Sequence, residues 1–152
     1  MIIESLYVLV LLMLLLGIYL RLSIAKRKKR LVADTLDVLS AYGQVERTDK
    51  AIRFITERAH YDVIFFHLPR GAELTINSRT IWEIEQYGRS RLIRQDLTGK
   101  RKRIIILYPS ESIPKRYINE NEMVLVRFDE PFYNTYLVNR SDLKTLLEKD
   151  IL

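Results

Sequence analysis

The chain has 152 residues, a formal net charge of +6 and no cysteine. The lack of cysteine excludes disulfides and cysteine-ligated zinc sites, and it fits a reducing compartment. Six of the 25 basic and one of the 19 acidic side chains lie in residues 1–30, which leaves 19 and 18 in residues 31–152. The positive charge therefore belongs to the N-terminal region, and a globally basic nucleic-acid-binding domain is not indicated.

An uninterrupted apolar run occupies residues 6–20, and its flanks extend it to about 20 residues or more, enough to cross roughly 30 Å of hydrocarbon. Lipid offers no hydrogen bonds to the backbone, so this run must be helical. Ser23-Ile24-Ala25 satisfies the cleavage rule of a signal peptide, which is the alternative. Such a leader needs positive charge before the apolar run, however, and the only charge there is Glu4. We therefore expect a retained transmembrane anchor over residues 1–25.

Five consecutive basic side chains follow the anchor: Lys26, Arg27, Lys28, Lys29 and Arg30. The positive-inside bias predicts an N-terminus outside the cell and everything after the flank in the cytoplasm. The flank either lies on anionic lipid, at about 1 kcal/mol per residue, or acts only as a stop-transfer signal. The predicted organisation is an anchor over 1–25, a basic juxtamembrane flank over 26–30 and one cytoplasmic globular domain over 31–152.

The first elements of the domain are predicted to be helical. Apolar residues at helical spacing indicate a short helix over 31–42, which Tyr42-Gly43 would end. A second helix is expected over 48–59, capped by Thr48 or Asp49, with one face formed by Ile52, Ile55 and Ala59. The continuous apolar stretch within 61–68 predicts a central strand, and Pro69-Arg70-Gly71 predicts a turn.

Residues 73–85 alternate as a β-hairpin around Asn77-Ser78-Arg79. A three-residue loop would pair Ile76 with Thr80 and Leu74 with Trp82. This register places Leu74, Ile76, Trp82 and Ile84 on one face. The opposite face then carries Glu73, Glu83 and Glu85.

The remaining segments complete an α/β domain. The basic stretch 86–103 reads as a helix followed by a loop, or as a mobile excursion, whereas 104–108 and 123–128 read as strands. A short strand or extended segment at 136–138 leads into a final helix capped by Ser141, with Leu143, Leu146 and Leu147 facing inward. This order predicts a mixed sheet flanked by helices, with an α+β arrangement as the alternative.

Glu73, Glu83 and Glu85 form the main cluster that could carry chemistry. Clustered carboxylates can hold Mg²⁺ or Mn²⁺, whereas charges on an edge hairpin also discourage strand addition. We favour the second reading. Only His60 and His67 could serve as bases, and no nucleophile motif or phosphate-binding glycine loop accompanies them.

The order of these segments, with Gly43-x-x-Glu46, the acidic hairpin ending in Trp82-Glu83-Ile84-Glu85 and the strand 104–108, resembles PD-(D/E)XK nucleases. It is most similar to the membrane-associated nuclease-related (NERD-type) domains, over roughly residues 43–150. The resemblance implies a restriction-endonuclease-like fold, with Glu85 on the family's Glu position, Glu73 near its Asp and Glu46 as its helix acid. Glu73 and Glu85 would then be the metal ligands. The family's lysine falls on Tyr87, which implies a relative that does not cleave.

A second candidate site is the basic stretch, which could contact lipid or nucleic acid or simply be solvated. Its members are Arg89, Arg91, Arg94, Lys100, Arg101, Lys102 and Arg103. We expect a single-pass membrane-anchored cytoplasmic interaction domain with no cofactor and no catalytic activity, bound to the membrane and to a protein partner whose identity the sequence does not give. The alternative is a membrane-tethered, metal-dependent nuclease-like domain using Mg²⁺ or Mn²⁺.

Overall fold

The computed structural model describes residues 2–49, 51–149 and 152, and it divides into two compact units, 1–37 and 38–152. The N-terminal helix α1 runs without a break over Ile2–Ser40. No proline or glycine occurs between Ile18 and Tyr42, and the lysines, arginines, leucines and alanines there favour helix. The helix predicted at 31–42 is therefore the continuation of α1 past the basic flank, and it ends three residues before Gly43.

The first unit carries the expected apolar segment. Within Leu9–Ser40 an 18-residue stretch has a mean hydropathy of 2.0, and this is the one helix in the described part of the chain that is long and apolar enough to cross a membrane. The large apolar side chains between Leu9 and Ile24 are about half exposed or more. At about 1.5 Å per residue, α1 is nearly twice as long as the hydrocarbon core of a bilayer is thick.

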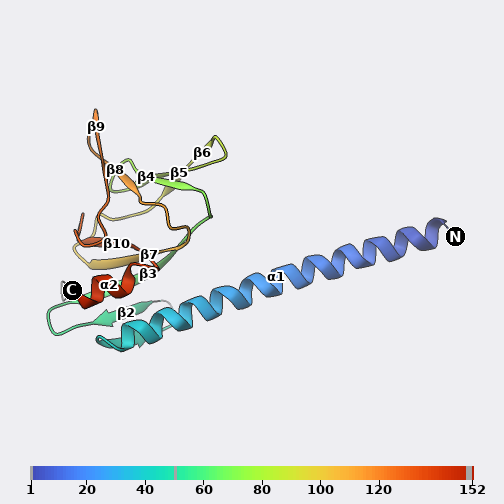
Figure 1. The fold of residues 1–152 in the computed structure, drawn as a ribbon, viewed down its shortest axis with the longest axis horizontal. Helices are drawn as coiled ribbons and strands as arrows, with labels where there is room; N and C mark the ends of the chain where they lie inside the picture. Colours follow the sequence, from blue (N-terminus) through green and yellow to red (C-terminus); the bar gives the residue numbers. More distant parts are fainter. Residues whose placement is uncertain (1, 50, 150–151) are drawn as a thin grey trace. The chain divides into compact units, whose positions relative to one another are not determined.

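The described part of the second unit contains two five-stranded sheets and a C-terminal helix, α2 (Leu143–Glu148; Figure 1). Sheet A has the order β1 (Gln44–Arg47), β2 (Ile52–Ile55), β3 (His60–Leu68), β7 (Lys102–Pro109) and β10 (Thr135–Asn139). Sheet B has the order β6 (Arg89–Arg94), β5 (Ile81–Gln86), β4 (Glu73–Ile76), β8 (Lys115–Asn119) and β9 (Glu122–Leu125). Both sheets are mixed, because β3, β7 and β10 run parallel in one, and β4 and β8 run parallel in the other. The predicted α/β class with a mixed sheet is confirmed, whereas the second sheet was not predicted.

The core between the sheets is built from apolar side chains of both. Trp82 is fully buried, and its ring lies 5.4 Å from that of Phe66 on β3. The same cluster includes Leu74, Ile76 and Ile84 from sheet B and Ile105, Leu107 and Leu137 from sheet A. In Figure 1, α2 (Leu143–Glu148) lies on the side of sheet A that faces away from sheet B. Its Leu143, Leu146 and Leu147 are buried, as predicted.

The hairpin prediction was right about the faces and wrong about the register. Ile76 pairs with Trp82, and Leu74 pairs with Ile84, so the loop has five residues instead of three. The Ser78 hydroxyl accepts the backbone N–H groups of Thr80 and Ile81, which stabilises this wider loop. Because the shift is two residues, every side chain keeps its predicted face.

The helix predicted over 48–59 was wrong: this segment contains β2 and the turns that flank it. Thr48 and Ala51 close one turn, and Thr56 and Ala59 close the other. Between them β2 pairs with β1 on one side and β3 on the other, which buries Phe54 completely. This pairing overrides the helical spacing of the apolar residues.

Smaller differences concern segment ends. The stretch 86–103 contains β6 and a loop instead of a helix, and β8 was not predicted at all. The strand expected at 123–128 is β9, which ends at Leu125. The N-cap of α2 is Asp142 instead of Ser141, and it makes no side-chain cap hydrogen bond. His60 begins β3 instead of ending a helix.

Candidate interaction surface

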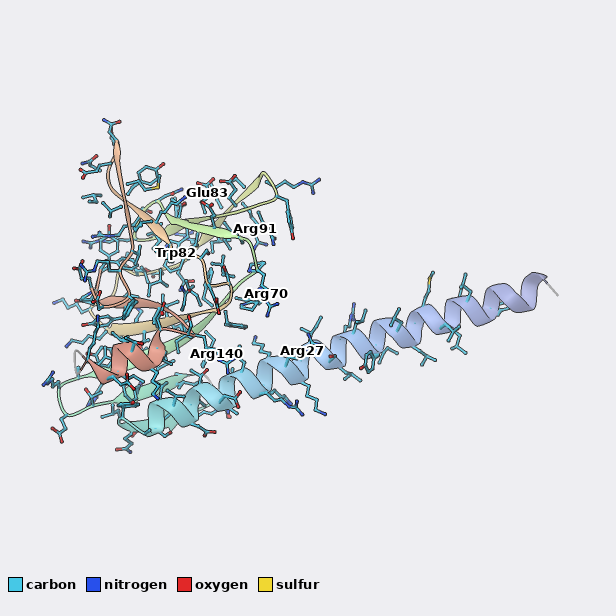
Figure 2. All side chains as sticks on the ribbon, in the orientation of Figure 1. Arg27, Arg70, Trp82, Glu83, Arg91 and Arg140 are labelled. Atoms are coloured by element: carbon cyan, nitrogen blue, oxygen red, sulfur yellow. The ribbon has the colours of Figure 1, made fainter. Side chains whose placement is uncertain are left out.

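The three hairpin carboxylates share the face of sheet B that points away from sheet A. Glu73 and Glu85 are direct cross-strand partners, and Glu83 lies opposite Thr75. Figure 2 shows Glu83 above β5 and Trp82 below it, toward sheet A. We refer to the side that bears these carboxylates as the outer face of sheet B.

Each of two carboxylates on the outer face is engaged by neighbouring side chains. Glu83 accepts hydrogen bonds from the Ser90 hydroxyl and, at 3.3 Å, from the Asn77 amide, and these bonds lower its pKa. Glu73 forms an ion pair with Lys115, whose Nζ lies 2.6 Å from Glu73 Oε2. The hydrogen bond and the charge of Glu73, together with the charge of Glu85, raise the pKa of Lys115.

The third acid of the nuclease alternative lies elsewhere. Glu46 is on β1, a strand at the edge of sheet A, whereas Glu73 and Glu85 are in sheet B. Over residues 2–49 and 51–149, no three acidic or histidine side chains are arranged so that they could hold a metal ion together. The segment that the resemblance makes a helix around Glu46 is a strand.

The basic stretch is divided between two ends of the domain. Arg89, Arg91 and Arg94 lie on β6, and Arg89 and Arg91 line a hollow together with Pro69, just beyond the end of β3. The group 100–103 precedes and begins β7, beside the start of β3, where Arg101 lies 3.6 Å from Asp62. Since β3 and β7 stay in register for eight residues, Arg89 and Arg91 lie about 20 Å from the group 100–103 along the strands. Arg94 is at the far end of β6, where its charge and that of Arg103 both act on Asp96. The two ends of the basic stretch therefore cannot act as one patch on a small ligand.

The basic flank lies on α1, and all five side chains from Lys26 to Arg30 are exposed. Their spacing on a helix distributes them around its circumference at about 100° per residue. They therefore present positive charge in several directions, as a flank at a membrane surface does.

An apolar surface that the sequence did not reveal lies on β8 and β9. We define the β8–β9 arm as residues 113–125. It contains five large exposed apolar side chains, while only four others are exposed in the described part of residues 38–152. The five are Ile113, Tyr117, Ile118, Met123 and Leu125.

The strand register explains why the arm is apolar on its outer face. Tyr117 pairs directly with Met123, and Leu125 pairs with Lys115, which in turn lies beside Thr75 on the outer face of sheet B. Leu125 is 58% exposed although it is apolar. In addition, β9 is an edge strand of sheet B, so the backbone groups on the side away from β8 are available to pair with another strand.

The arm is bordered by an ion-paired cluster next to α2. Asp129 accepts hydrogen bonds from Lys149 at 2.8 Å and from Arg127, and these bonds lower its pKa to about 2. Leu125 and these three residues line a depression of about 400 Å³. The arm thus combines an apolar centre with a charged rim, which is the anatomy of many protein interfaces.

No protein-family model, curated protein or solved structure matches this chain, so its own residues carry the functional interpretation.

Proposed function

We propose that the protein is anchored in a membrane by a single pass of α1, with its N-terminus outside and residues 38–152 in the cytoplasm. The proposal is supported by the apolar segment that begins at Leu9 and by the five basic side chains that follow it. Charge of this sign and position is typical of the cytoplasmic end of a transmembrane helix.

We further propose that the domain is a non-catalytic module that binds a protein partner through the β8–β9 arm. The observation that carries this proposal is the concentration of exposed apolar side chains on the arm, next to the open edge of β9. Exposed apolar patches on a small domain mark interaction sites, and an open edge can accept a strand from a partner. The matching partner offers an apolar surface or an extended segment.

In-cell photo-crosslinking tests this module. A photoreactive phenylalanine analogue at Leu125 should give a discrete covalent adduct with one protein, and Met123→Asp in the same chain should abolish it. The analogue at Thr98, an exposed loop residue outside the arm, serves as the matched control. If Leu125 gives no adduct, or gives the same adducts as Thr98, the arm is not an interaction surface.

A nuclease-like function remains the alternative proposal, and one observation favours it. Lys115 lies beside Glu73, and the charge of Glu85 also acts on it, so two acids and a lysine share the outer face. A metal-dependent nuclease needs such a combination to hold an ion and stabilise a phosphate. Mg²⁺ or Mn²⁺ would then raise the melting temperature, and Glu85→Gln would remove both that response and DNA cleavage. The interaction module predicts a flat metal titration.

A further inference from the structure

The turn between β5 and β6 has an unusual residue at its tip. Tyr87 and Gly88 connect the two strands, and both have positive φ angles, 52° and 70°. Two-residue turns of this kind favour asparagine and glycine, because side chains with a bulky Cβ are strained there. The Tyr87 side chain is nevertheless 90% exposed. A large amphipathic ring is thus held at the end of a hairpin, where packing within the domain does not require it.

Arginines surround this tip. Arg89 and Arg91 are the cross-strand partners of Gln86 and Ile84, so they lie on the inner side of the hairpin. The Gln86 side chain donates a hydrogen bond of 3.0 Å to the backbone carbonyl of Arg70, which brings the β3–β4 turn beside the tip. Figure 2 shows Arg70 and Arg91 along the same side of the domain.

The charge at this tip is not neutralised within the part of the domain that the structure describes. Arg70, Arg89 and Arg91 are exposed and form no ion pair with any residue in 2–49, 51–149 or 152. The nearest acid along β5, Glu85, belongs to the outer face, across the sheet from Arg91. A hollow of about 610 Å³ is lined by Pro69, Ile84, Gln86, Tyr87, Arg89 and Arg91. The hollow is therefore positive and has an aromatic rim.

We propose that this tip, formed by Tyr87, Gly88, Arg89, Arg91 and Arg70, is a second membrane contact that binds the headgroups of anionic lipids. Guanidinium groups pair with lipid phosphates, and tyrosine is favoured at the level of the headgroups. The inference depends on the proposed anchor, because α1 extends only about 15 Å beyond Arg30 and so keeps the domain near the bilayer.

A lipid surface fits the tip better than a nucleic acid does. Single-stranded nucleic acids are bound by a series of stacked aromatic side chains, whereas Tyr87 is the single aromatic residue lining the hollow. Residues 31–152 carry 19 basic and 18 acidic side chains, which gives no broad field to attract a polyanion. A pair of arginines beside an exposed aromatic ring suits an anionic bilayer surface, because α1 already holds the domain near the bilayer.

The test uses the full chain with Tyr87→Trp, reconstituted into vesicles with the domain outside. Brominated phosphatidylcholine, with or without phosphatidylglycerol, serves as quencher, and the unsubstituted chain gives the background from buried Trp82. The fluorescence of the introduced indole should be quenched in the anionic vesicles and much less in neutral ones. The matched control Asn121→Trp, in the exposed β8–β9 turn, should not be quenched.

Charge variants in the same background decide the mechanism. Arg89→Gln with Arg91→Gln should lower the equilibrium constant for contact between the tip and the anionic bilayer about fivefold per charge, or roughly 30-fold together. Lys100→Gln with Arg101→Gln removes equal charge at the other end of the domain and should leave quenching unchanged. Tyr87→Asn is tested in a chain without the introduced indole. Because asparagine suits the turn, this variant should keep the melting temperature of the original chain. The protection of the tip from hydrogen exchange that anionic vesicles confer on the original chain should be lost in the variant.

Three outcomes would overturn the inference: no quenching of the introduced indole in anionic vesicles, equal quenching after both arginines are replaced, or a response to an oligonucleotide in place of lipid. Alkaline extraction of the vesicles tests the anchor separately from the lipid contact. A chain that resists alkaline extraction but shows no quenching keeps its anchor and lacks the lipid contact. A chain that alkali extracts refutes the anchor.

Discussion

The β4–β5 and β1–β2 hairpins lie in different sheets and differ in how clearly their sequences mark them. In β4–β5, acids or threonine alternate with buried apolar residues over both strands, so the period of two is repeated several times. In β1–β2, the strands have four residues each, and only Phe54 is fully buried. A repeated alternation determines the face of every side chain, whereas one buried residue leaves both helix and strand compatible with the pattern.

The largest effect is expected in the well-marked hairpin. Trp82→Ala should lower the free energy of unfolding by about 3–5 kcal/mol, because the ring is fully buried between the sheets and packs on Phe66. Chemical denaturation of the full chain in detergent measures it. A loss below about 1 kcal/mol, the range of ordinary surface substitutions, would mean that the sheets do not pack through this residue.

The poorly marked hairpin can be tested at Gly43. A Cβ there would lie 2.5 Å from the Ile55 carbonyl oxygen and 2.8 Å from the Phe54 ring. Gly43→Ala should therefore cost about 1–3 kcal/mol of stability, since the backbone of β2 has to move. If residues 48–59 were the helix that their spacing indicated, this contact would not exist. The same substitution would then be neutral or slightly stabilising.

The smallest effect is expected on the outer face of the first hairpin. Glu83→Gln should cost less than about 1 kcal/mol at pH 7, because its partners Ser90 and Asn77 lie at a solvated surface. The folded state lowers the pKa of Glu83, so its contribution is present above the unfolded-state pKa and is lost as the pH falls through the folded value. Thermal melts should show a smaller difference in melting temperature between the original chain and the Glu83→Gln variant at pH 3 than at pH 7. A constant difference at both pH values would mean that the carboxylate charge plays no part.

Much of the fold follows from the sequence, and the exceptions have physical causes. The apolar N-terminal helix, the buried strands 61–68 and 104–108 and the inward face of α2 follow from apolar runs and spacing, and all are present. The register around Ser78 could not be predicted, because it depends on hydroxyl hydrogen bonds within the loop. Because the observed register differs from the predicted one by an even number of residues, every side chain still lies on its predicted face.

The candidate surfaces were harder to predict for a physical reason. On the β8–β9 arm, Tyr117, Met123 and Leu125 face solvent, so the usual link between apolar character and burial fails there. The basic stretch is continuous in sequence, but the chain traverses β6 and a loop between Arg89 and Arg103, which separates the charges in space. Proximity in the sequence therefore does not predict proximity in space when a strand lies between the two residues.

The most direct test of the central proposal is the side of the membrane on which residues 38–152 lie. The chain has no native cysteine, so Asn121→Cys, in the exposed β8–β9 turn, introduces a single reactive thiol. A membrane-impermeant maleimide should leave intact cells unlabelled and should label this thiol after permeabilisation. Labelling in intact cells would contradict a cytoplasmic domain held by α1.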